Sequence, residues 1–168
     1  MLLDTCNTAH GVQSKDTLRL IALCASVHKE ALTPFLGKIT ILISKKIKES
    51  ADAGVREVCA DVIGLVARFV PPVSNDQTNS LGIYLKPLFT LLNDQDKGTQ
   101  SAAGICISEV IHNSLYEHVS GDLPRIVSRI LERLAHPNYQ AHGALFSALA
   151  KLPEVCFTLT NVHENVIS

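Results

Sequence analysis

Histidines are the side chains of this sequence that first suggest metal chemistry. There are seven of them, and two pairs, His112 with His118 and His136 with His142, are each separated by six residues. A six-residue spacing does not bring two side chains to one helix face, where ligands three or four residues apart would meet. The sequence also lacks the HExxH pattern of helical zinc sites. We therefore expect no metal site.

Carboxylates and nucleophiles give no catalytic pattern either. Asp94 and Asp96 form an acidic turn, but the later Gly and Glu of a calcium-binding EF-hand loop are missing, so helix capping explains the two carboxylates better. The sequence contains no GxSxG, no GxxxxGK and no GxGxxG. We predict no catalytic residues, no cofactor and no enzymatic activity.

The cysteines are expected to be reduced and structural. The chain has five, an odd number with no CxxC pair, and three of them stand inside apolar helical patterns. Such thiols behave as small hydrophobic side chains. The five are Cys6, Cys24, Cys59, Cys106 and Cys156.

The composition indicates an all-α protein. Of 168 residues, 46% are hydrophobic but only 5% are aromatic, and there is no Trp. Aliphatic, Ala- and Leu-rich sequences favour helices over a β-sandwich. Apolar spacing, Pro and capping residues predict helices over residues 14–28, 33–48, 52–69, 81–93, 98–113, 122–135 and 137–153. We expect a poorly defined segment over residues 1–13, a repeat array over 14–153 and a tail over 154–168.

The predicted helices repeat with a period near forty residues. Segments that begin at Asp16, Val55, Thr99 and Tyr139 can be aligned, with offsets of 55 − 16 = 39, 99 − 55 = 44 and 139 − 99 = 40. Two helices per unit at this period are typical of HEAT and armadillo repeats. The sequence therefore predicts a HEAT/armadillo-type α-solenoid of three to four helix pairs, with a non-repeating helical bundle as the alternative.

Small residues recur at one position of the aligned units. Ala60, Gly104 and Ala144 occupy it, whereas the first unit places Ile21 there and fits least well. We expect neighbouring helices to approach closely at the small residues. The turns before the later units, SADAG, NDQDKG and AHPN, contain Asp or Asn, which are expected to cap the helices that follow.

Over about residues 11–152 the sequence resembles a plant family. The stretch from GVQSKDTLRL to GLVARFV, then LKPLFTLLNDQDKGTQSAAGICISEVI and HGALFSALAKL, is similar to HEAT units of the TORTIFOLIA/SPIRAL microtubule-associated proteins. The resemblance implies a TOG-like helical-repeat domain that binds microtubules. Compared with the family, one repeat is expected to be missing or truncated before the first aligned unit.

Basic side chains recur where the first helix of each pair ends. Lys29, Arg68 and His112 share a repeat position, since 68 − 29 = 39 and 112 − 68 = 44, and Lys151 falls one residue short of it. Asn113 adds a polar contact. The resemblance implies that tubulin binds this edge, because TOG domains use the turns within helix pairs. The alternative is that cations simply suit helix carboxyl ends.

A second basic cluster, at Lys45, Lys46 and Lys48, falls at the opposite edge of the predicted array. Charge runs on helices usually form a solvated face. We expect that role for these three lysines.

The charge balance restricts the expected partners. With 15 Lys and Arg against 16 Asp and Glu, the net charge is −1, which argues against a general nucleic-acid binder. No apolar run approaches the ~18 residues of a membrane span. We expect tubulin or microtubules as partners, with other proteins on the repeat surface, in the cytoplasm on the cytoskeleton. The alternative is an armadillo-type scaffold, for example one linked to the nuclear envelope and actin.

Overall fold

The fold is an α-solenoid built from three helix pairs, with one helix before them and one after them in the described part of the chain. The computed structural model describes residues 2–70, 81–114 and 116–157, without the side chains of residues 116–118 and 154–157. These residues form helices and turns and no strand. The elements are α1 (Leu2–Thr8), α2 (Gly11–His28), the 3-10 helix η1 (Lys29–Phe35), α3 (Leu36–Glu49), α4 (Ala53–Phe69), α5 (Gly82–Leu91), α6 (Lys97–His112), α7 (Tyr116–Leu134) and α8 (His142–Phe157).

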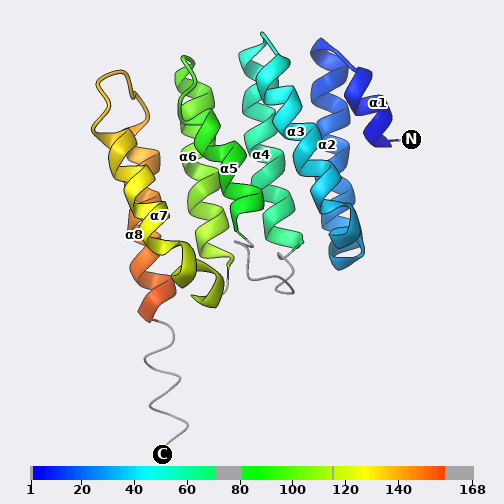
Figure 1. The fold of residues 1–168 in the computed structure, drawn as a ribbon. Helices are drawn as coiled ribbons and strands as arrows, with labels where there is room; N and C mark the ends of the chain where they lie inside the picture. Colours follow the sequence, from blue (N-terminus) through cyan, green and yellow to red (C-terminus); the bar gives the residue numbers. More distant parts are fainter. Residues whose placement is uncertain (1, 71–80, 115, 158–168) are drawn as a thin grey trace, which may run out of the picture.

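The helices are arranged in two layers. In Figure 1, α3, α5 and α7 lie in front, and α2, α4, α6 and α8 stack side by side behind them. The helices of the rear layer all run downward in this view, so the turns fall on two edges. We call the lower one the intra-pair edge, where α2, α4 and α6 end. The upper one, where α4, α6 and α8 begin, is the inter-pair edge.

Close approach within the rear layer confirms the prediction made from small residues. A Cβ added to Gly104 would lie 2.7 Å from the Cβ of Ala144 on α8, and one added to Gly64 would lie 2.9 Å from the Cys106 Sγ on α6. Both distances are below ordinary van der Waals contact. Side-chain size therefore sets the spacing of these helices.

The pattern of buried and exposed residues repeats between α2 and α4 with an offset of 38 residues. The sequence alignment gave an offset of 39 residues for the same two helices. Ala22 and Ala60 are both buried, and 60 − 22 = 38; the exposed Leu23 and Asp61 show the same offset. Ala22, not Ile21, therefore occupies the small-residue position of the first unit. The alignment missed this because two adjacent buried apolar residues fit the pattern equally well.

Three predicted helix boundaries were wrong. The helix expected from residue 122 begins at Tyr116, because Asp122 is buried within α7 and pairs with Arg125 at 3.0 Å instead of capping a helix. The last helix begins at His142 and not at residue 137. Pro153 lies inside α8 and does not end it.

The start of α3 also differs from the prediction. Pro34 stands within the 3-10 helix η1, and the α-helix begins two residues later at Leu36. The 3-10 turn accommodates the fixed φ of proline, and no α-helical hydrogen bond is lost there, because proline has no N–H to donate.

The N-terminal segment contains helix α1, which packs on α2 and α3. The Lys46 Nζ is buried and donates to the Ala9 carbonyl at 2.6 Å, and the Lys45 Nζ donates to the Asn7 Oδ1 at 2.8 Å. The expectation that Lys45, Lys46 and Lys48 form a solvated face was therefore wrong for Lys46. Only Lys48 of the three has neither burial nor a hydrogen bond within the described chain.

Burial makes two of the thiols unreactive. Cys59 and Cys106 are buried, and desolvation raises the pKa of each to about 12. Cys6 is buried and Cys24 is partly exposed, and all four are free. The predicted role as small hydrophobic side chains is confirmed for the three buried thiols, and the side chain of Cys156 lies outside the described residues.

Candidate functional site

The intra-pair edge carries three of the predicted basic side chains at the same end of the rear layer. Lys29 follows the last residue of α2, Arg68 is the penultimate residue of α4, and His112 ends α6. All three are exposed. Because neighbouring packed helices lie ~8–10 Å apart, these three side chains form a spaced row along the edge.

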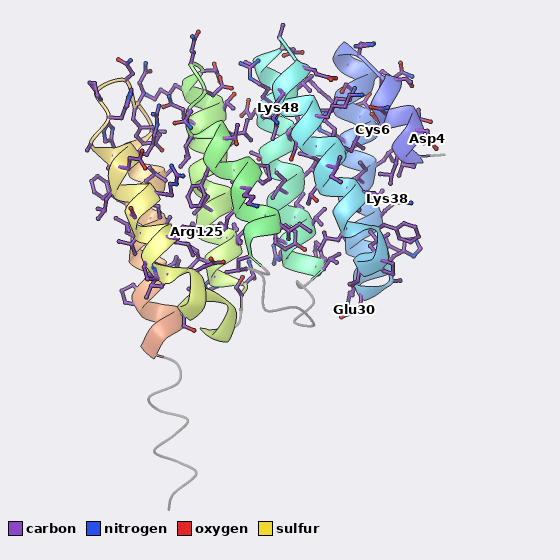
Figure 2. All side chains as sticks on the ribbon, viewed as in Figure 1. Asp4, Cys6, Glu30, Lys38, Lys48 and Arg125 are labelled. Atoms are coloured by element: carbon purple, nitrogen blue, oxygen red, sulfur yellow. The ribbon has the colours of Figure 1, made fainter. Side chains whose placement is uncertain are left out.

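Lys29 reaches this edge by a different route from Arg68. It leaves the helix with a φ of 43°, while its N–H still donates to the Ala25 carbonyl. By the 38-residue offset, Arg68 corresponds to Glu30, which is exposed at the lower end of the array (Figure 2). Glu30 offsets part of the positive charge of Lys29.

Arg68 and Asn113 are held locally and remain accessible. The Arg68 guanidinium lies 5.8 Å from the centre of the Phe69 ring, a cation–π distance. The Asn113 Nδ2 donates to the Glu109 carbonyl at 2.8 Å and lies 3.2 Å from the Glu109 Oε2. Both side chains are exposed, so a partner could reach either.

Lys151 does not lie at the end of its helix. Because α8 continues to Phe157, Lys151 is six residues before the last one, and it is half-buried. It therefore stands apart from the other predicted basic residues, which lie within a residue or two of a helix end. His118 belongs to the residues whose side chains are not described.

The inter-pair edge uses its charges differently. The Arg56 Nε lies 2.6 Å from the Asp94 Oδ2 and its Nη2 lies 3.0 Å from the Asp94 Oδ1, so the pair is bidentate. The Arg56 Nη1 also donates to the Ser50 carbonyl at 2.9 Å. Only 17% of the Arg56 side chain and 10% of the Asp94 side chain are exposed. This pair joins one repeat to the next.

The predicted capping is confirmed for Asp52 at the start of α4 and Asp96 at the start of α6, but it was wrong for Asp94, whose carboxylate pairs with Arg56. The Asp52 Oδ1 accepts from the Gly54 N–H at 2.8 Å, and its Oδ2 lies 3.2 Å from the Lys15 Nζ on α2. The Asp96 Oδ2 accepts from the Thr99 N–H at 2.7 Å. Each carboxylate satisfies an amide that the helix itself leaves without a partner.

Gln100 continues the connection from α6 to the turn before α8. Its Nε2 donates to the Asp94 carbonyl at 2.7 Å, and its Oε1 accepts from the Gln140 N–H at 2.9 Å. The side chain is buried. Together with the Lys15–Asp52 and Arg56–Asp94 pairs, it forms what we call the inter-pair ladder.

The inter-pair ladder shifts the ionisation of its members. The hydrogen bond to Asp94 raises the pKa of Arg56. Burial alone would raise the pKa of Asp94, but hydrogen bonds from Arg56 and from backbone amides outweigh it and lower that pKa below its ordinary value. Both groups are therefore charged at neutral pH.

Sequence reasoning did not find the ladder, although its signal was present. Arg56 and Gln100, whose side chains make these contacts, share one repeat position, since 100 − 56 = 44. A polar residue that recurs beside buried apolar positions is a sign of a hydrogen bond between repeats.

Within the described side chains, no group of three or more His, Cys, Asp or Glu could hold a metal ion.

The described helices include none that combines the length and the apolar character needed to cross a membrane.

Two stacked layers, close contacts at recurring small residues and charged turns at both edges define an α-solenoid of the HEAT/armadillo type. The sequence profile of the TORTIFOLIA1 N-terminal family matches residues 1–168, and the chain belongs to this family.

Curated relatives from Arabidopsis thaliana agree with this assignment. "Microtubule-associated protein TORTIFOLIA1" is 28% identical in an alignment 160 residues long that covers 92% of this chain and 18% of the relative. "TORTIFOLIA1-like protein 1" is 29% identical in an alignment 160 residues long that covers 92% of this chain and 19% of the relative. "TORTIFOLIA1-like protein 2" is 29% identical in an alignment 147 residues long that covers 86% of this chain and 17% of the relative. The chain thus spans less than a fifth of the length of these relatives.

Proposed function

We propose that this chain is a non-catalytic microtubule-binding module that acts on the cytoskeleton in the cytoplasm. The observation that carries the proposal is the match of the whole chain to the TORTIFOLIA1 N-terminal family. One relative that is similar to this chain is named as a microtubule-associated protein. The solenoid supports it, because stacked repeats present an extended surface to a partner.

The intra-pair edge is the proposed contact. Lys29 and Arg68 are exposed there, and His112 and Asn113 extend the row with polar groups. Tubulin has an acidic surface, and a row of cations increases the rate of encounter with such a surface even when each pair contributes little energy. Lys151, half-buried and farther from the edge, contributes at its margin.

Co-sedimentation with taxol-stabilised microtubules tests this function. The chain is expected to pellet with microtubules at low salt and less at moderate salt, because screening weakens contacts between exposed charges. Actin filaments serve as the comparison, since an actin-linked scaffold is the competing hypothesis. Absence of pelleting above background with microtubules at low salt contradicts the proposal, and preferential pelleting with actin replaces it.

A further inference from the structure

The front layer carries a second basic surface, separate from the intra-pair edge. Figure 2 shows Lys48 on α3 and Arg125 on α7, both in the layer that faces the viewer. Lys86 of α5 and Arg129 of α7 lie with them along two adjoining grooves. We call Lys48, Lys86, Arg125 and Arg129 the basic face.

Lys86 connects the two grooves. The first, of about 450 Å³, runs between α3 and α5; its charged lining is three lysines, Lys45, Lys48 and Lys86, against one carboxylate, Glu49. The second, of about 250 Å³, runs between α5 and α7 and is lined by Lys86, Arg125 and Arg129, among others. A ligand that follows both grooves would pass Lys86 at the middle.

Two cations of the basic face have no partner in the chain. Over the described residues, neither Lys48 nor Lys86 forms an ion pair or a side-chain hydrogen bond, and both are exposed. By contrast, the Arg125 Nη2 lies 3.0 Å from the Asp122 Oδ1, and the Arg129 Nη1 lies 3.3 Å from the Glu132 Oε2. Lys48 and Lys86 are therefore available to an anionic partner without the loss of an internal contact.

The rear layer carries exposed charges of both signs, with Arg19 and Arg68 among the cations. The residues exposed along α4 and α6 include Glu57, Asp61 and Glu109. The pKa of Asp61 is raised by partial burial and by the neighbouring Glu57, as expected where carboxylates gather. Helices α3 and α5 of the front layer differ, with five Lys against one Glu, so a net charge of −1 hides a local excess of cations there.

From the adjoining grooves, the unpaired lysines and this local excess of cations we propose that the basic face binds an extended acidic peptide. Ser44 in the first groove and Asn93 in the second offer polar groups to the peptide backbone. This proposal does not depend on the intra-pair edge.

A labelled peptide of about eight glutamates, matched to one of about eight glutamines, tests the inference by fluorescence anisotropy. The glutamate peptide is expected to bind the intact chain, with an affinity that falls as salt rises, and the glutamine peptide to bind at least tenfold more weakly. Equal binding of the two peptides would overturn the proposal.

Paired charge reversals locate the site. Lys48→Glu with Lys86→Glu should weaken binding of the glutamate peptide at least tenfold. Lys29→Glu with Arg68→Glu makes the same change in net charge at the intra-pair edge and should alter peptide binding less than twofold. If the edge variant loses as much affinity as the face variant, the peptide responds to net charge and the site is refuted.

Further controls keep the outcomes separate. Circular dichroism should show that both variants are folded, and Lys48→Gln with Lys86→Gln replaces the reversal if they are not. Tighter binding of a single-stranded oligonucleotide of equal charge, or peptide binding lost through self-association in light scattering, would overturn the proposal. Failure of microtubule pelleting alongside specific peptide binding would refute the proposed function and leave this inference standing.

Discussion

Arg56 and Arg68 lie at opposite ends of helix α4, and they differ in burial and in contacts. Arg56, in the first turn of α4, is bound on two sides by Asp94 and Ser50, and only 17% of its side chain is exposed. Arg68, in the last turn, is exposed and contacts the Phe69 ring. The inter-pair edge uses its charges to hold repeats together, whereas the intra-pair edge leaves its charges accessible to a partner.

Alanine at each arginine should separate these two roles most clearly. Arg56→Ala leaves the largely buried Asp94 carboxylate without its partner, and we expect a loss of about 2–3 kcal/mol in the free energy of unfolding. Arg68→Ala should change it by less than about 0.5 kcal/mol, because the side chain is exposed. Urea denaturation followed by circular dichroism measures both. Similar losses for the two variants would remove the distinction between the edges.

The close contacts between the edges give a second test, independent of charge. Gly104→Ala should destabilise the protein by about 1–3 kcal/mol, because the new methyl group would lie 2.7 Å from the Ala144 Cβ. Gly121 lies in helix α7 with nothing within 4 Å of an added Cβ, so Gly121→Ala should stabilise by up to about 1 kcal/mol. Equal effects in thermal unfolding would mean that the rear layer can relax and that the inter-pair ladder alone sets the spacing.

Acid should weaken the inter-pair edge. The pKa of Asp94 is lower in the folded protein than the ordinary value of about 3.9. A depressed carboxyl pKa stabilises the folded state above the unfolded pKa, and this stability is lost as the pH falls through the folded pKa. The free energy of unfolding should therefore decline below about pH 4, and the decline should be shallower in Arg56→Ala. An identical pH profile for both proteins would contradict this role of the pair.

The repeat architecture could be predicted because period, small residues and capping carboxylates are local sequence signals. Gly104 and Asp96 act in the structure as their patterns indicated, and Ala60 is fully buried. The ladder is different, since the partners Arg56 and Asp94 are 38 residues apart and their contact depends on how two helices stack.

The candidate site was predictable only in part, for related reasons. Sequence spacing placed Lys29, Arg68 and His112 at one edge, but it could not show that Pro153 lies inside α8 and leaves Lys151 away from the helix end. The basic face was missed because its members come from three helices whose side-by-side order is set by the tertiary fold. In the sequence, Lys86 is an isolated lysine with no pattern around it.

Charge reversal at the intra-pair edge should have the smallest effect on folding. Lys29→Glu with Arg68→Glu should leave the free energy of unfolding within about 0.5 kcal/mol of the parent, since both side chains are exposed. Urea denaturation of the double variant checks this. A loss comparable to that of Arg56→Ala would show that the edge is structural.

Microtubule pelleting of this double variant tests the central claim most directly. The matched control is Arg19→Glu with Lys97→Glu, which makes the same change in net charge at exposed positions on the rear layer and the inter-pair edge. The account predicts that at low salt the edge variant binds microtubules at least tenfold more weakly than the parent, while the control stays within about twofold. Unchanged binding of the folded edge variant, or an equal loss in the control, would contradict it.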